Sequence, residues 1–227
     1  MRPWLRAERT LESLNRNAAG VRTASGRPLR FVPPGAHDTS YELRIHGTGE
    51  VPTRPDNLHD WFNALAWLAF PRTKAQINAL HAAHIPRESG QRGRFRDLLT
   101  IFDEGGAVVV CDDEELIGLL RGMRWKELFW QRRSRVLAAM RFLVIGHAVL
   151  EKARAPWPGI TCKAIVVPAG GEVDEQASQW LARLTSEATP RELLPLPVFG
   201  YPGWFRENER AEFYDDTRYF RSYGNAG

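Results

Sequence analysis

"LHDWFNALAWLAFPRTKAQINALHAAH", residues 58–84, is the long apolar segment from which the fold of this chain is most readily argued. Its apolar residues recur at helical spacing. Pro71 divides the segment, because proline is tolerated in the first turn of a helix but not inside one. Asp56 and Asn57 stand just before it, and both residue types cap helices. We therefore expect two helices that meet at Pro71.

The flanking sequence predicts both helices and strands. Residues 41–47 alternate as a strand does, residues 161–170 are typical of an inner strand, and residues 97–113 carry two apolar runs around "DEGG", which indicates a hairpin. Helical periodicity is expected in five further segments, residues 1–17, 113–123, 124–136, 137–154 and 173–188.

Together these elements predict an α+β fold, a helix-rich single domain with a small, mainly antiparallel sheet of about four strands. We expect residues 1–55 to form an N-terminal helix and a Pro/Gly-rich arm packed on the domain. Residues 56–227 are expected to form the α+β core and to end in a C-terminal tail that wraps the surface.

The composition indicates a cytoplasmic globular protein. Apolar residues make up 43% of the chain, yet no apolar run is long enough to cross a membrane. The N-terminal residues are charged throughout, so we expect no signal peptide among them. Cys111 and Cys162 lack the spacing of a metal or redox motif, so we expect two reduced, buried thiols. No membrane partner is expected.

The first candidate site lies at the start of the quoted segment. His59 and Asn63 are four residues apart and share a helix face, and Asp60 lies beside them at the helix N-terminus. A histidine and a carboxylate together bind metals or transfer protons. A carboxylate in a first helical turn also stabilises the helix dipole, so a purely structural role stays open.

Two further candidates lie later in the chain. His147 and Glu151 share a face of an apolar helix, and Gly146 indicates the close approach of another backbone or of a ligand. Asp215 and Asp216 form a carboxylate pair near an arginine. The structural alternatives are a buried histidine bonded to a carbonyl group and a turn closed by a salt bridge.

These groups lead to a first hypothesis, a hydrolase-type enzyme that acts on a small molecule in a His/carboxylate cleft. The predicted catalytic residues are His59, Asp60, Asn63, His147 and Glu151. A divalent metal that activates water would be held by His59, Asp60, His147, Glu151, Asp215 and Asp216. Lys74 and His81 lie two helical turns apart and would line the same cleft.

The second hypothesis is a module that binds nucleic acid or a nucleotide. All but four of the 31 basic residues are arginine, which suits bidentate contacts to phosphate. Basic and aromatic residues interleave at 121–141, a pattern found where bases and phosphates bind. The predicted anion-binding residues are Lys74, Arg124, Lys126, Arg132 and Arg133. The alternatives are a solvated basic face with its aromatic residues in the core, and a structural or interaction protein without catalysis.

The familiar phosphate-loop, dinucleotide-binding, zinc-protease and nucleophile-elbow patterns do not occur. Six segments in order carry a family resemblance instead: "GEVPTRPDNLHDWFNALAWLAFPRTKAQINALH", "LTIFDEGGAVV", "RWKELFW", "GHAVLEK", "LPLPVFGYPGW" and "FYDDTRYFR". They resemble the bacterial family catalogued as domain of unknown function 3025, from about residue 20 to the tail. The resemblance implies a bacterial, proteobacterial soluble protein. It supplies no activity and no catalytic residue.

Overall fold

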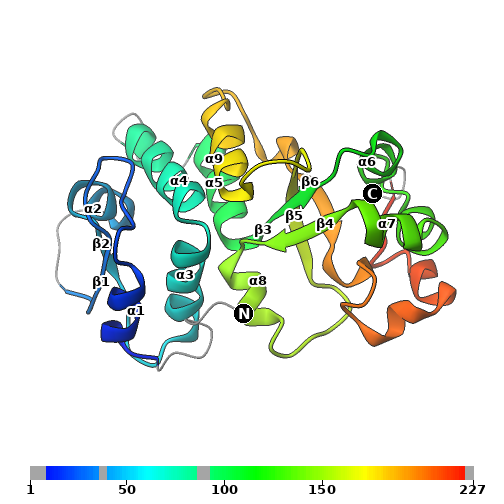
Figure 1. The fold of residues 1–227 in the computed structure, drawn as a ribbon, viewed down its shortest axis with the longest axis horizontal. Helices are drawn as coiled ribbons and strands as arrows, with labels where there is room; N and C mark the ends of the chain where they lie inside the picture. Colours follow the sequence, from blue (N-terminus) through cyan, green and yellow to red (C-terminus); the bar gives the residue numbers. More distant parts are fainter. Residues whose placement is uncertain (1–8, 36–39, 86–92, 223–227) are drawn as a thin grey trace. The chain divides into compact units, whose positions relative to one another are not determined.

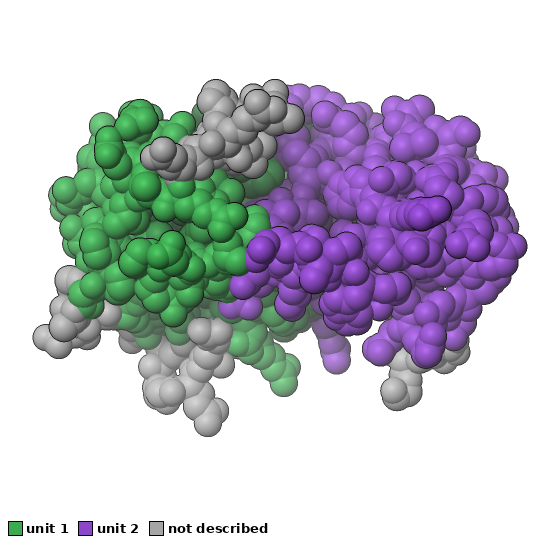
Figure 2. All heavy atoms as spheres, turned by 90° about the horizontal axis from the view of Figure 1, so that it is seen from below, with its two compact units in different colours: residues 1–103, 174–190 green, residues 104–173, 191–227 purple. Residues whose placement is uncertain are grey.

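The computed structural model describes residues 9–35, 40–85 and 93–222 (Figure 1). The chain forms two compact units, shown in separate colours in Figure 2. Unit 1 consists of residues 1–103 and 174–190, and unit 2 of residues 104–173 and 191–227. The partition that we predict, with an arm over residues 1–55 and a core over residues 56–227, stays a prediction beside this division.

Unit 1 is mainly helical. Its elements are α1 (Leu11–Asn17), β1 (Arg30–Val32), α2 (Tyr41–Thr48), β2 (Glu50–Pro52), α3 (Leu58–Ala69), α4 (Pro71–His84), most of α5 (Arg94–Gly105) and α9 (Val173–Ala182). Strands β1 and β2 pair in parallel. The buried core includes Phe31, Ile45, Val51, Leu65 and Trp67.

The two helices expected on either side of Pro71 are confirmed as α3 and α4. The Asn57 side chain accepts a hydrogen bond from the backbone N–H of Asp60 at 2.9 Å, as a helix cap does. Pro71 occupies the first turn of α4, where its missing N–H costs nothing. The segment 58–84 therefore forms two separate helices, joined at Phe70.

Unit 2 is built on a four-stranded sheet with the order β4-β3-β5-β6. Its strands are β3 (Gly106–Val110), β4 (Arg141–Val144), β5 (Thr161–Val167) and β6 (Leu194–Pro197). The two central strands β3 and β5 run parallel, and each outer strand is antiparallel to its neighbour. The predicted α+β class with a small, mainly antiparallel sheet is therefore confirmed.

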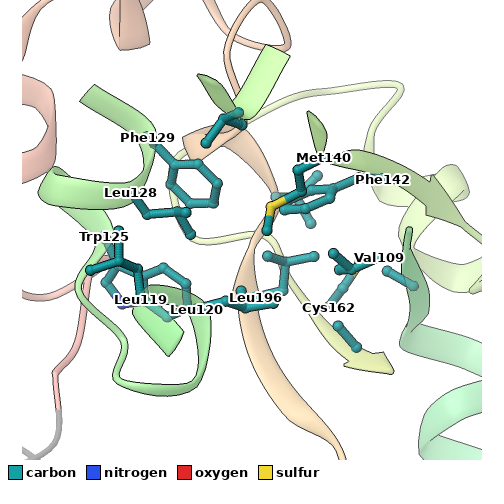
Figure 3. Close-up of a cluster of buried hydrophobic side chains, with 14 of the residues drawn as sticks. Val109, Leu119, Leu120, Trp125, Leu128, Phe129, Met140, Phe142, Cys162 and Leu196 are labelled. Atoms are coloured by element: carbon teal, nitrogen blue, oxygen red, sulfur yellow. The ribbon is translucent and has the colours of Figure 1, made fainter. Parts of the chain in front are cut away.

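Helical segments complete unit 2. They are α6 (Glu114–Arg121), a π-helical turn (Glu127–Gln131), α7 (Arg133–Ala139), α8 (His147–Lys152) and short 3₁₀ turns at Pro190–Glu192, Val198–Gly200, Arg206–Glu209 and Ala211–Asp215. Figure 3 shows Leu120, Phe129 and Met140 pointing toward strand residues such as Cys162 and Leu196. Aromatic side chains of the C-terminal tail, Tyr214, Tyr219 and Phe220, belong to the same core.

Three predictions of local structure are wrong. Residues 41–47 form helix α2, because Ser40 caps it and Gly49, with φ at 78°, ends it. Residues 97–113 form no hairpin: the first apolar run is helix α5, whose buried Phe95, Leu98, Leu99 and Phe102 share one helical face. Residues 137–154 do not form one helix, because β4 interrupts it and pairs with β3.

The described helices contain no segment that combines the length and the apolar composition needed to cross a membrane.

Candidate functional site

Asn63 and Lys74, two polar residues of the segment 58–84, belong to a largely buried network in unit 1. Lys74 is only 4% exposed, and its ammonium group donates to Asn63 Oδ1 at 2.8 Å and to Asp103 Oδ1 at 2.5 Å. Asn63 Nδ2 donates in turn to the hydroxyl group of Tyr41 at 2.8 Å. The ammonium group also lies 5.6 Å from the ring centroid of Trp67, within cation–π range.

This network joins α2, α3, α4 and α5. Burial of its hydroxyl group, and secondly the negative charge of Asp103, raises the pKa of Tyr41, which therefore stays protonated at neutral pH. Both polar atoms of the Asn63 amide are hydrogen-bonded within the network, and the charge of Lys74 is compensated by Asp103. Asn63 and Lys74, predicted respectively as catalytic and anion-binding, thus meet each other in a polar contact that fixes four helices.

A second polar group in unit 1 surrounds His81. Its Nδ1 atom accepts a hydrogen bond from Arg96 Nε at 3.2 Å, and Arg96 also pairs with Glu42 at 3.8 Å. Asn78 Nδ2 donates to the Glu42 carbonyl oxygen at 2.9 Å. These contacts tie α4 to α2 and α5, so His81 serves packing between helices.

Asp60 forms an ion pair with Arg54. Its carboxylate accepts from the Arg54 backbone N–H at 2.8 Å and from Nε and Nη2 of the guanidinium group, both at 2.9 Å. Partial burial works to raise the pKa of Asp60, but the hydrogen bonds and charge of Arg54 prevail and lower it. The carboxylate is thus ionised and fully engaged. His59 lies beside it, half-buried.

His147 begins α8 and is 4% exposed. The preceding Gly146 meets the start of β3: a Cβ atom there would lie 2.6 Å from Glu104 O, Gly105 Cα and Gly106 N. The predicted close approach at Gly146 is therefore confirmed, and its neighbour is backbone. Glu151 follows on the same short helix and is half-buried.

The paired carboxylates of the tail are both in ion pairs. Asp215 accepts from Lys126 Nζ at 2.7 and 2.8 Å. Asp216 accepts from the backbone N–H and the guanidinium group of Arg218 at 3.0 to 3.2 Å, and these hydrogen bonds lower its pKa. This is the salt-bridged turn foreseen as the structural alternative.

The predicted metal ligands divide between the two units. His59 and Asp60 belong to unit 1, whereas His147, Glu151, Asp215 and Asp216 belong to unit 2. In the part of the chain that the structure describes, no three His, Cys, Asp or Glu side chains are grouped so as to hold a metal ion. Metal binding stays a prediction.

Most of the basic cluster at residues 121–141 of unit 2 is paired with carboxylates. Arg132 contacts Glu115 at 2.8 Å, and Arg133 contacts Glu209. Further pairs join Arg124 to Glu127, Lys126 to Asp215 and Arg135 to Asp113. The interleaved Trp125 and Phe129 are buried in the core. The predicted anion-binding side chains of this cluster, Arg124, Lys126, Arg132 and Arg133, therefore have their charges compensated by carboxylates within unit 2.

A pocket of about 780 Å³ opens elsewhere in unit 2. Its floor includes the paired ends of β5 and β6, where Thr161 faces Pro197 and Lys163 faces Pro195. Its other lining residues are Met123, Trp125, Trp157, Pro158, Gly159, Cys162, Leu196, Asp216, Arg218, Tyr219 and Arg221. The volume is that of a small-molecule site.

The pocket is basic. Lys163, Arg218 and Arg221 line it against the single acidic residue Asp216, and Asp216 is bound to Arg218. Among the described residues, no carboxylate forms an ion pair with Lys163 or Arg221. Arg221 is held by other contacts: its Nε donates to the Arg218 carbonyl oxygen at 3.3 Å, and its own carbonyl oxygen accepts from Trp125 Nε1 at 2.7 Å. Two cations are therefore available to an anionic ligand.

Cys162 and Tyr219 in the pocket wall are not available as reactive groups. Cys162 is 2% exposed, and burial raises the pKa of its thiol to about 12, so it carries no thiolate at neutral pH. The hydroxyl group of Tyr219 donates to the Ile160 carbonyl oxygen at 2.8 Å and accepts from the Phe199 N–H at 2.9 Å. Both side chains build the wall, and the groups left for a ligand are cations and aromatic rings.

Sequence reasoning missed much of this pocket. Trp157 and Gly159 lie in "APWPG", which indicates only a helix breaker, and Lys163 is 58 residues away from Arg221 in the sequence. A tryptophan between two prolines and followed by glycine was the available signal, since such a segment presents the ring in a fixed turn. Tyr41 and Asp103 were missed because they were assigned to a strand and a hairpin turn.

The comparisons with known proteins give one match. The model of a family described as "Protein of unknown function (DUF3025)" matches residues 29–223. No curated protein and no solved structure matches.

Proposed function

Because the chain belongs to this family of unknown function, we propose a function from its structure alone. The protein binds a small anionic molecule in the basic pocket of unit 2. The observation that carries the proposal is the pair Lys163 and Arg221, two cations in one pocket without a carboxylate partner in the described structure. A charge-assisted hydrogen bond to a ligand contributes about 1.5–3 kcal/mol.

The pocket also suits a small molecule better than a nucleic acid. Its volume of about 780 Å³ accommodates one compact ligand. A nucleic-acid surface needs a row of available cations, whereas the basic residues predicted for that role are in ion pairs. Lys163 and Arg221, and not the paired basic residues at 124–133, are therefore the residues proposed to bind the anion.

The hydrolase hypothesis stays a separate prediction. It is tested by metal analysis of untagged protein purified without chelators: stoichiometric metal that is lost in either His59→Ala or His147→Ala would support it. We also propose, from the sequence alone, that the protein acts in the bacterial cytoplasm.

Calorimetric titration tests the pocket directly. Ribose 5-phosphate, AMP and indole-3-carboxylate serve as acid-bearing probes for the wild type, for Lys163→Met and for Lys152→Met. Lys152 is the matched control, an exposed lysine of unit 2 at the end of α8 that does not line the pocket. We expect binding that weakens as salt is raised and that falls about tenfold or more in Lys163→Met only.

Equal affinity in the two lysine variants would contradict the proposal, as would the failure of every acid-bearing probe to bind the wild type.

A further inference from the structure

Trp157 is an exposed aromatic side chain in the wall of the basic pocket. It is 55% exposed, more than any other large apolar side chain in the described part of the chain. The apolar surface of an exposed tryptophan is in contact with water, and a ligand that covers the ring removes this surface from water, which favours binding. Trp157 therefore has the position of a stacking platform.

Gly159 leaves room for the ring. A Cβ atom at residue 159 would lie 1.8 Å from Cζ3 of the Trp157 ring and 2.5 Å from Cη2, so the indole occupies the space that any side chain would take. Gly159 has φ at 142°, a conformation that other residues rarely adopt. Pro158 between them fixes one more backbone angle. A side chain at residue 159 would therefore displace the ring from this position.

The same pocket supplies the charges for an acidic group. Lys163 lies in β5, four residues after Gly159, and Arg221 comes from the C-terminal tail. The pocket thus combines an aromatic platform with cations that lack a carboxylate partner among the described residues. This combination complements a molecule that is planar and apolar at one end and acidic at the other.

We infer that the ligand of the unit 2 pocket is an aromatic acid, a planar ring that stacks on Trp157 and bears a phosphate or carboxylate group that pairs with Lys163 and Arg221. The inference rests on the proposed function and adds the ring. It assigns Trp157 as the residue that selects the ligand and Gly159 as a residue that positions Trp157. Phosphate and carboxylate share the chemistry that the two cations recognise.

Four probes separate the two parts of this ligand. AMP carries a ring and a phosphate, indole-3-carboxylate a ring and a carboxylate, ribose 5-phosphate an acid without a ring, and adenosine a ring without an acid. We expect either ring-bearing acid to bind the wild type at least about tenfold more tightly than ribose 5-phosphate or adenosine, because only a ring-bearing acid gains both the stacking on an aromatic side chain and the pairing with the cations.

Trp157→Leu should weaken the preferred ring-bearing acid about tenfold or more and leave ribose 5-phosphate unchanged. Trp204→Leu is the matched control, because Trp204 is 38% exposed and does not line the pocket. Gly159→Ala should reproduce the Trp157→Leu effect by displacing the ring. Circular dichroism of each variant confirms that it is folded.

The inference is overturned if ribose 5-phosphate binds as tightly as both ring-bearing acids, or if Trp157→Leu and Trp204→Leu bind the ring-bearing acids alike. In either case salt-sensitive binding that is lost in Lys163→Met would leave the proposed function standing. If no acid-bearing probe binds the wild type, the proposed function and the inference fall together.

Discussion

Replacing Lys74 with methionine removes the cation at the centre of the buried network while keeping a side chain of similar length. Asp103 loses its ion-pair partner, and the amide oxygen of Asn63 loses its donor in an environment where Asn63 is 8% exposed. Breaking a buried ion pair by removing one partner costs about 3–5 kcal/mol. The Asp103 side chain is 22% exposed, so water relieves part of its charge and we expect the lower end, about 3 kcal/mol.

Urea unfolding followed by circular dichroism measures this loss. With an m-value of about 1–3 kcal/mol/M, a loss of about 3 kcal/mol lowers the midpoint by about 1 M or more. The double variant Lys74→Met/Asp103→Leu removes both charges, and it should recover most of the stability because no uncompensated charge is left.

The reasoning is refuted if Lys74→Met costs less than about 1 kcal/mol, the value of an exposed salt bridge. It is equally refuted if the double variant is as unstable as the sum of the two single variants, because independent sites add and a charge pair does not.

Three further predictions concern single side chains. Gly146→Ala should lower stability by about 1–3 kcal/mol or more, because the added Cβ atom would overlap the backbone at the start of β3. Gly118→Ala, in α6 with open space around it, should instead raise the melting temperature slightly. Equal effects of the two substitutions in thermal melts would contradict this prediction. Asp60 has a lowered pKa in the folded state, so its ion pair with Arg54 stabilises above the ordinary pKa of 3.8 and is lost as the pH falls through the lower folded value; urea unfolding between pH 2 and 6 should show a shallower acid limb in Asp60→Asn, and an unchanged limb would disprove it. Cys162, with a thiol pKa of about 12, should react with a thiol reagent at pH 8 only after unfolding; stoichiometric labelling of the native protein within minutes would show that the thiol is accessible.

The parts of the fold that sequence reasoning predicts are those with strong local signals. Asn57 caps the start of α3 and Pro71 begins α4, and both act in the structure as their chemistry requires. Strand β5 is recognised from its β-branched, apolar run. Helix α2 is missed because its eight residues also alternate, so only the cap at Ser40 distinguishes the two periods.

The candidate sites show a different limit. His59, Asp60 and Asn63 share a helix face as spacing predicts, but their partners are set by tertiary contacts: Arg54 for Asp60, and Tyr41 with Lys74 for Asn63. A charge count along the chain cannot show which cations are already paired. In the structure, Arg132 and Arg133 of the 121–141 cluster pair with carboxylates, whereas Lys163 and Arg221 line a pocket without such a partner among the described residues. Lys163 and Arg221 are therefore the better candidates for anion binding.

Photolabelling with 8-azido-AMP, followed by peptide mapping, reports where an aromatic acid binds on the chain. We expect label on residues 157–163 or 216–221 that excess AMP displaces. We also expect the label on these residues to be lost in Lys163→Met and kept in Lys152→Met. Competed label that maps elsewhere, or label on these residues that AMP does not displace, would contradict the assignment of the pocket.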